Sequence, residues 1–142
     1  MNTTNKTIVA GFIEEIWNQN LFEKIDNYVS ACFIDHSLPS DLPANKEGTK
    51  TWISKTGRSF THKTQIDDII SEGDKVVVKI KMQLKHIGVW RDIEPTGTEV
   101  ESIGYRLFKL ANKKIVEHWA LIDGSAIEKK LSVNTRACKI QN

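Results

Sequence analysis

The feature that most constrains the fold is a change of hydrophobic period half-way along the chain. Residues 75–87 alternate between an apolar face and a lysine-rich face, which is the pattern of a strand with one buried side. Three further segments, 64–72, 98–110 and 114–123, share the alternation and the content of β-branched residues. The turns EGDK and ANKK join neighbouring segments, so this half of the chain predicts an antiparallel sheet. The apolar face of residues 75–87 consists of Val76, Val78, Ile80, Met82 and Leu84, and His86 continues it.

The first half of the chain has helical spacing instead. Apolar residues recur at helical intervals in residues 5–18, and a shorter helix with Leu21 and Ile25 follows. The stretch ACFIDH predicts a short strand, and residues 46–59 predict a third helix. A last short helix is expected from about Ser125 to Leu131. Helices followed by antiparallel strands predict an α+β domain in which helices pack on one face of a curved sheet.

The length of 142 residues fits one domain over residues 1–142, with a core of about 6–131 and a frayed tail at 132–142. The formal net charge is only +2 and the basic residues are scattered, so we expect no nucleic-acid partner. No apolar run approaches the ~18 residues that span a membrane, and MNTTNK lacks the order of a signal peptide. We therefore expect a cytoplasmic protein without membrane contact.

The sequence contains no recognisable metal or cofactor motif. Cys32 and Cys138 are too few and too far apart for a disulfide framework or a zinc motif. The GTK at residues 48–50 lacks the glycine-rich loop of a phosphate site. Four histidines are too dispersed to indicate a metal. We expect no cofactor and no metal. The histidines are His36, His62, His86 and His118.

The segment KIVEHWALID raises the question of whether His118 and Asp123 form a catalytic pair. A separation of five residues places the two side chains on opposite faces of a strand, so they are not expected to interact. With Lys113 in the left-handed turn position, Leu110 would pair with Lys114. Arg106 would then lie opposite His118, and Gly104 opposite Ala120, with all four on one face. Ser102, Val116 and Ile122 would share that face.

Several segments match a known family in order and spacing. They are FIEEIWNQ in the first helix, FIDH in the first strand, SEGDKVVVK, HIG followed by PTG, and YRLFKLANKKIVEHW. Together they span most of residues 6–131. The chain resembles the SnoaL-like polyketide (ester) cyclases of the nuclear transport factor 2-like superfamily.

This resemblance implies a cone-shaped α+β barrel, with N-terminal helices packed on a strongly curved, mainly antiparallel sheet that encloses an apolar pocket. It also implies a cofactor-independent ring closure by intramolecular aldol condensation. In such cyclases an aspartate on the last strand acts as base and acid, and a histidine on the preceding strand assists. Those two positions fall on Ala120 and Arg106 of this chain. The fold is therefore expected to transfer, whereas the usual base is missing.

The remaining polar residues of the expected pocket face suggest a different site. We expect His118 as general base or acid and Arg106 as support for a ligand oxygen, because a buried arginine favours a carboxylate or an enolate-like oxygen. Asp35 is expected to face away from this pocket. A structural alternative is an Arg106 salt bridge to Glu47, Asp68 or Glu117, with His118 packed as a neutral ring. Candidate substrate-binding residues are His36, His86, Trp17, Ser102 and Trp90.

Three functions stay open at this point. The first is a cofactor-independent lyase or isomerase that acts on a small carbonyl or acidic compound. The second is a binding protein that holds a small apolar acid or metabolite without chemistry, and the third is an oligomeric structural protein. The resemblance also implies a homodimer through the outer face of the sheet, where apolar side chains are expected to be exposed. These are Ile103, Tyr105, Trp119 and Leu121.

Overall fold

The computed structural model describes residues 4–140, with side chains through Ser132. Helical segments precede most of the strands and a longer helix ends the chain, so the α+β expectation is confirmed. The elements are α1 (Asn5–Gly11), η1 (Phe12–Asn18), η2 (Phe22–Asn27), β1 (Val29–Asp35), α2 (Lys46–Ser59), β2 (Phe60–Glu72), β3 (Lys75–His86), β4 (Glu99–Ala111), β5 (Lys114–Ile122) and α3 (Gly124–Ile140).

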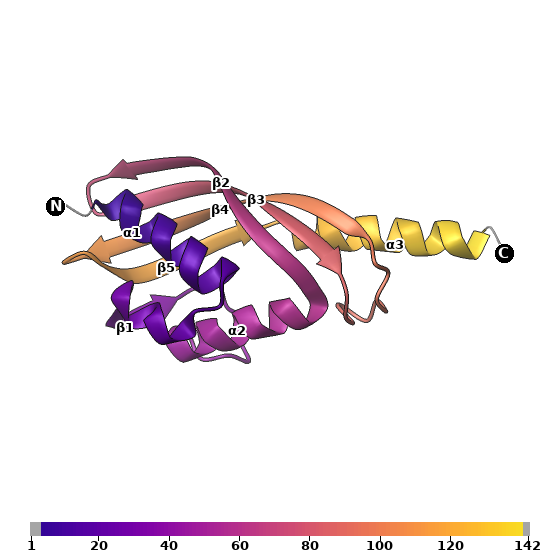
Figure 1. The fold of residues 1–142 in the computed structure, drawn as a ribbon, viewed down its shortest axis with the longest axis horizontal. Helices are drawn as coiled ribbons and strands as arrows, with labels where there is room; N and C mark the ends of the chain where they lie inside the picture. Colours follow the sequence, from indigo (N-terminus) through magenta and orange to yellow (C-terminus); the bar gives the residue numbers. More distant parts are fainter. Residues whose placement is uncertain (1–3, 141–142) are drawn as a thin grey trace.

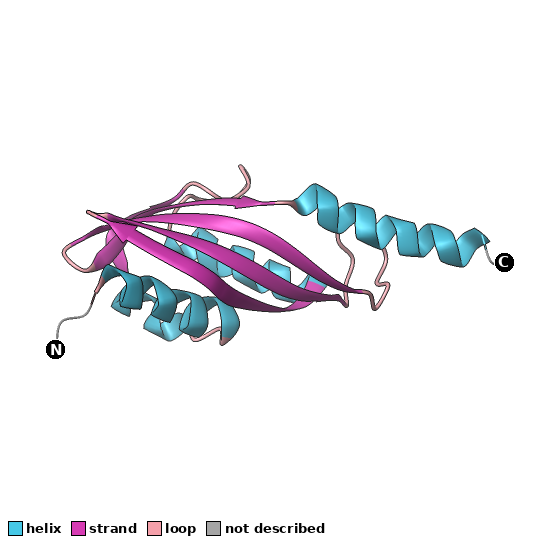
Figure 2. Ribbon diagram, turned by 90° about the horizontal axis from the view of Figure 1, so that it is seen from above, coloured by secondary structure: helices cyan, strands magenta, loops and turns pink. Residues whose placement is uncertain are grey.

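The five strands form one curved sheet in the order β1-β5-β4-β3-β2. All neighbours are antiparallel except β1 and β5, which run parallel. Because β1 and β2 remain at opposite edges, the sheet is open and does not close into a barrel. The N-terminal helices and α2 cover one face of the sheet, which we call the inner face, and the opposite face is the outer face (Figures 1 and 2).

The core lies between the inner face and the helices. Strand β3 shows why, since Val76, Val78 and Ile80 are fully buried while Val77 and Lys79 between them point outward. The predicted alternation of this strand is therefore confirmed. Helix η1 supplies the opposing apolar surface: Phe12, Ile13, Ile16 and Trp17. The apolar face of these helices packs against the apolar face of the alternating strands, which removes both faces from water.

Helix α3 extends beyond the sheet at the end opposite the N-terminus (Figures 1 and 2). Asp123 caps its start, because its Oδ1 accepts the Ala126 N–H at 2.9 Å. Ile127 and Leu131 pack on the same end of the sheet in a second apolar cluster. The sequence predicted a shorter helix ending near Leu131, whereas α3 continues to Ile140. The side chains of the predicted frayed tail lie outside the described residues from 133 onward. No described helix has both the length and the apolar character of a membrane-spanning segment.

The register predicted for the β4–β5 hairpin is wrong. Asn112 and Lys113 both adopt positive φ, so a two-residue turn pairs Ala111 with Lys114. A bulge next to Leu110 then shifts the pairing again. The turn and the bulge each shift the pairing by one residue, and a total shift of two leaves each side chain on its predicted face. Arg106 and His118 therefore still lie on the same face of the sheet. Arg106 now lies opposite Ala120, and His118 lies opposite Phe108.

Candidate active site

The centre of the candidate site is a buried pair of side chains from the parallel strands β1 and β5. Asp35 and His118 are register partners, and Asp35 Oδ1 lies 3.0 Å from His118 Nδ1. Both side chains are 1% exposed. The tertiary fold thus brings together a carboxylate and an imidazole that are 83 residues apart in the sequence.

The Asp35 carboxylate accepts hydrogen bonds from three further donors. The Ser37 N–H and hydroxyl lie 3.0 and 2.5 Å from Oδ1, and the Thr49 hydroxyl lies 2.7 Å from Oδ2. Thr49 is positioned by the first turn of α2, whose N-cap Asn45 accepts the Gly48 N–H. Burial alone would raise the pKa of Asp35, but the hydrogen bond and charge of His118, with the Ser37 and Thr49 hydrogen bonds, hold it well below its usual value. Asp35 is therefore ionised at neutral pH.

The hydrogen bonds of His118 define its tautomer. A carboxylate can only accept, so the ring carries its proton on Nδ1 and donates it to Asp35. The other nitrogen, Nε2, accepts a hydrogen bond from Arg106 Nη1 at 3.3 Å. Burial lowers the pKa of His118 and the charge of Arg106 lowers it further, against the opposing effect of Asp35. The imidazole, which stacks on Phe108 at 4.7 Å, is therefore neutral at neutral pH.

Arg106 is a nearly buried cation with few partners. Its side chain comes from β4 and the residue is 4% exposed. Among the described residues its only hydrogen bond is the one to His118, and no carboxylate lies within ion-pair distance. Burial lowers the pKa of Arg106 to about 10, with Asp35 opposing the shift, so the guanidinium stays charged at neutral pH. The salt bridges considered from the sequence, to Glu47, Asp68 or Glu117, are not present.

An indole covers the guanidinium. Arg106 Cζ lies 4.4 Å from the ring centroid of Trp17, which η1 presents to the sheet. Trp17 is 6% exposed, and its Nε1 is buried without a hydrogen-bond partner among the described residues. The rings of His62 and Trp17 form a T-shaped pair, with 6.1 Å between their centroids. Burial, followed by the charge of Arg106, lowers the pKa of His62.

The structure brings together three of the residues singled out in the sequence, namely Arg106, His118 and Trp17. His36 does not join them. It lies on the outer side, where its ring stacks on Trp119 at 4.7 Å and its Nε2 lies 3.0 Å from Glu117.

The prediction that Asp35 faces away from the pocket is wrong. Sequence reasoning missed it although the signal was present in the strand alternation. Phe33 is apolar and buried, so a period of two places Asp35 inward and leaves Ile34 and His36 outward.

His86 and Trp90 lie at the other end of the sheet. Val78 is the partner of Arg106 on β3, and His86 follows eight residues later, which is about 26 Å along a strand. There His86 Nδ1 lies 3.0 Å from the Thr96 hydroxyl, and Trp90 packs edge-on against Phe60.

Ser102 is intermediate in position. It is buried on the inner face of β4, four residues from Arg106, or about 13 Å along the strand. Ser102, His86 and Trp90 are therefore not brought into contact with Arg106 and His118.

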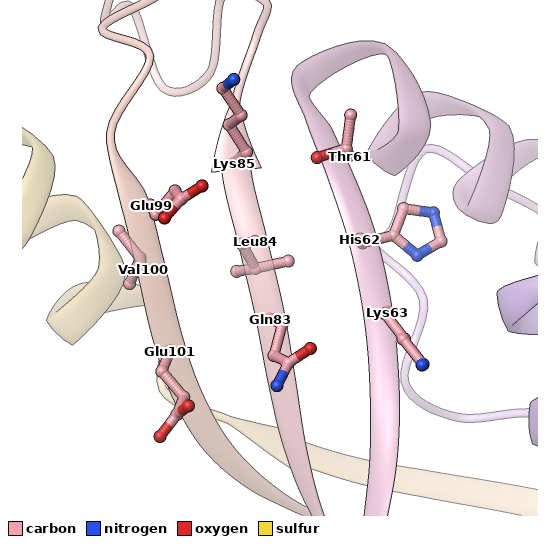
Figure 3. A pocket seen from close by; sticks show the side chains of 9 residues that line it. All are labelled: Thr61, His62, Lys63, Gln83, Leu84, Lys85, Glu99, Val100 and Glu101. Carbon is pink, nitrogen blue, oxygen red and sulfur yellow. The ribbon is translucent and has the colours of Figure 1, made fainter.

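Two hollows of the surface do not coincide with this site. One, of about 570 Å³, lies over β2, β3 and β4 (Figure 3). Most of its lining side chains belong to the exposed outer face. They are Thr61, Lys63, Gln83, Lys85, Glu99 and Glu101. The other, of about 540 Å³, lies beside β1 and the β4–β5 turn. Neither hollow is lined by Arg106 or His118. Within the described part of the chain, no three His, Cys, Asp or Glu side chains converge as metal ligands would.

Comparison with known proteins identifies the family. A family model described as SnoaL-like polyketide cyclase matches residues 7–131. The chain belongs to the SnoaL-like polyketide cyclase family. The resemblance seen in the sequence is therefore confirmed, and this family membership supports a small-molecule pocket protein. A search of curated proteins gave no match.

Solved structures show the same fold. Wild-type IdmH from Streptomyces antibioticus superimposes with a TM-score of 0.82 at 20% identity, covering 92% of this chain and 99% of IdmH. A SnoaL-like polyketide cyclase from Agrobacterium tumefaciens gives 0.76 at 15% identity, with 92% and 99% covered. AclR from Streptomyces galilaeus gives 0.76 at 20% identity, with 90% and 95% covered. The cone-type arrangement of helices on a curved sheet is thus confirmed for this SnoaL-like protein, with the sheet open at its edges.

Proposed function

We propose that this SnoaL-like protein is a cofactor-independent lyase or isomerase that moves a proton next to a carbonyl group of a small organic compound. The observation that carries the proposal is the hydrogen-bonded series Asp35–His118–Arg106. Asp35 fixes the tautomer and orientation of the imidazole, so that Nε2 is the nitrogen able to accept a proton. The cation next to it, Arg106, can support the negative charge that such a reaction creates.

The chemical step uses this chain's own side chains. His118 Nε2 removes a proton from the carbon beside the carbonyl, so the C–H bond breaks and an N–H bond forms. The electron pair moves to the carbonyl oxygen, and Arg106 donates a hydrogen bond to the resulting enolate. The imidazolium is stabilised by Asp35 and then returns its proton to the product. For this step Arg106 must exchange its 3.3 Å hydrogen bond with Nε2 for one with the substrate oxygen.

The proposal also accounts for the missing cyclase aspartate. By resemblance, the aspartate position of the family falls on Ala120 and its histidine position on Arg106. Ala120 lies directly opposite Arg106 in the sheet. We propose that Asp35 of β1 replaces the lost carboxylate in this protein, acting through His118 rather than on the substrate itself.

The alternative is a binding protein for a small apolar acid or metabolite. The observation that favours it is that Nε2 of His118 is already occupied by Arg106, which leaves no free base in the unliganded protein. In that case the ligand binds Arg106 and no bond to hydrogen is broken.

Deuterium exchange distinguishes the two functions. Acetone, pyruvate and levulinate in D2O are followed by proton NMR with wild-type protein and with His118→Gln. Proton transfer by His118 predicts exchange next to the carbonyl that falls about 100- to 10,000-fold in the variant. His36→Gln is the matched control, because His36 lies on the outer side, and it should retain wild-type exchange. Exchange that persists in His118→Gln, or no exchange by the wild type, contradicts catalysis by this residue.

We propose in addition that the protein forms a homodimer through the outer face of the sheet. Ile103, Tyr105 and Leu121 are 52%, 48% and 76% exposed there, and a second copy of the chain would remove these apolar side chains from water. Size-exclusion chromatography with light scattering should give a dimer for the wild type and a monomer for Leu121→Glu. Val89→Glu, in the β3–β4 loop, is the matched control and should remain dimeric. A wild-type monomer contradicts the proposal.

A further inference from the structure

The charge of Arg106 is not balanced at the position where it lies. The carboxylate that acts on it, Asp35, is on the far side of the His118 ring and already accepts hydrogen bonds from His118, Ser37 and Thr49. A buried cation without a contacting anion is unfavourable by several kcal/mol, on the order of what its desolvation costs. Arg106 has five N–H donors, and one of them, on Nη1, has an acceptor among the described residues. The guanidinium therefore retains the capacity to bind an anion.

The indole of Trp17, which lies against the Arg106 guanidinium, carries another donor without an acceptor among the described residues. Trp17 Nε1–H is buried and has no partner among the described residues, although its ring covers the guanidinium at 4.4 Å. Buried N–H groups normally find an acceptor, so the indole N–H and the N–H groups of the neighbouring arginine that lack one form a set of donors suited to the oxygens of a ligand. A carboxylate offers two oxygens and a negative charge, which suit a bidentate guanidinium and an additional N–H. A ketone offers one neutral oxygen.

We propose that the ligand of this site is an organic acid bound as its carboxylate anion by Arg106 and the Trp17 Nε1–H, and that His62 takes up a proton when the anion binds. The inference rests on the proposed function for the location of the ligand at Arg106. It does not depend on whether a reaction follows.

His62 is placed to respond to the anion. It lies on the inner face of β2, edge-on to Trp17, and neither ring nitrogen has a hydrogen-bond partner among the described residues. From α2 it meets Gly57, which has no side chain, and from β3 it faces Leu84. The charged group that acts on it is Arg106 of β4.

Neutralising Arg106 with an anion removes the charge that opposes protonation of His62 and adds one that favours it. His118 faces the same guanidinium and is the competing site for the proton.

Because Arg106 and Trp17 are only 4% and 6% exposed, the acid must displace the indole or the His62 ring to enter. Binding is therefore expected to change the fluorescence of Trp17. Because His62 is partly exposed whereas Trp17 is buried, we expect the acid to enter from the side of His62.

Matched acid and amide pairs test the ligand class. Acetate, benzoate and phenylacetate are compared with acetamide, benzamide and phenylacetamide by thermal shift and isothermal titration calorimetry. We expect at least one acid to bind about tenfold or more tightly than its amide, because hydrogen bonds to charged groups contribute about 1.5–3 kcal/mol. Arg106→Gln should abolish this preference, and Arg58→Gln, at an exposed position of α2, should retain it.

The outcomes separate the two proposals. If amides bind as tightly as acids and Arg106→Gln weakens both, the acid class is overturned while the proposed carbonyl site stands. If no compound binds in an Arg106-dependent manner, both are overturned. Trp17→Phe keeps the aromatic ring but removes the N–H, and it should weaken the acid severalfold. Unchanged acid binding in Trp17→Phe overturns the role of the indole donor.

Calorimetry in buffers of different ionisation enthalpy measures the proton uptake. At pH 7 the wild type should take up a fraction of a proton per acid bound, and acid affinity should rise as the pH is lowered toward 6. His62→Gln should bind the acid with the same preference over its amide but without the uptake. Uptake that persists in His62→Gln and disappears in His118→Gln overturns the assignment to His62, as does the absence of uptake in the wild type.

Discussion

Asp35 and His118 face each other across the parallel pair β1 and β5, with 3.0 Å between Oδ1 and Nδ1 and almost no solvent contact. The hydrogen bond connects the first strand of the chain to the last one. Strand β1 follows the first helices, and β5 is the last strand of the sheet. A hydrogen bond between them therefore supports both the edge of the sheet and the orientation of the candidate base.

Replacing the Asp35 carboxylate should destabilise the protein. Asp35→Asn removes the negative charge that acts on Arg106 across the His118 ring, and it weakens the hydrogen bonds from His118 and Thr49. We therefore expect a loss of about 3 kcal/mol in the free energy of unfolding. Urea denaturation measures this loss. Asp41→Asn, at an exposed loop position, should change the unfolding free energy by less than about 0.5 kcal/mol. Equal effects of the two variants would show that the buried hydrogen bonds do not stabilise the fold.

Stability should fall as the pH is lowered from 7 to 5. Burial and the charge of Arg106 lower the folded-state pKa of His118, and the same two causes lower that of His62, so the unfolded chain binds more protons below about pH 6.5. At lower pH, Asp35 also makes stability fall as the pH falls. Its folded-state pKa is depressed, so its stabilisation is present above about pH 4 and is lost below it. Urea unfolding at pH 7, 6 and 5 tests the upper range. His118→Gln should reduce the slope between pH 7 and 5, and an unchanged slope in this variant contradicts the role of His118.

The Thr49 hydroxyl should contribute measurably to the site. Thr49→Val keeps the shape of the side chain but removes the 2.7 Å hydrogen bond to Asp35, and we expect a loss of about 1.5–3 kcal/mol, as for other hydrogen bonds to charged groups. Thr51→Val is the matched control in the same helix, because the Thr51 hydroxyl donates to a backbone carbonyl at an exposed position. A smaller loss for Thr49→Val than for Thr51→Val would contradict the proposed anchoring of Asp35 by α2.

Two glycines of α2 should respond in opposite directions to alanine. A Cβ at Gly48 would lie 1.8 Å from the backbone oxygen of Pro43, so Gly48→Ala must shift the helix start that carries Thr49. We expect a loss of more than about 2 kcal/mol. A Cβ at Gly57 meets only His62, at an ordinary 3.8 Å, so Gly57→Ala should stabilise the helix by up to about 1 kcal/mol. Thermal and urea unfolding of both variants give the comparison, and destabilisation by Gly57→Ala would contradict this account of the helix.

The sequence specifies the elements and the faces of this protein because these depend on local periodicity. The alternation of residues 75–87 defines the buried side of β3, and the predicted bounds of α2 agree with Lys46–Ser59. The shared face of Arg106 and His118 was also predictable, because strand parity survives two shifts of register. The family resemblance supplied the arrangement of helices packed on a curved sheet.

Only the tertiary structure decided which side chains meet. The register of the last hairpin depends on two left-handed turn residues and a bulge, neither of which a pattern of polarity specifies. The partner of His118 is Asp35, which is distant in sequence and adjacent only because β1 joins β5 in parallel. The donors of Arg106 and Trp17 that have no acceptor among the described residues lie where β4 meets η1. Contacts of this kind depend on how distant elements pack, and local sequence fixes each element but not the distance between two of them.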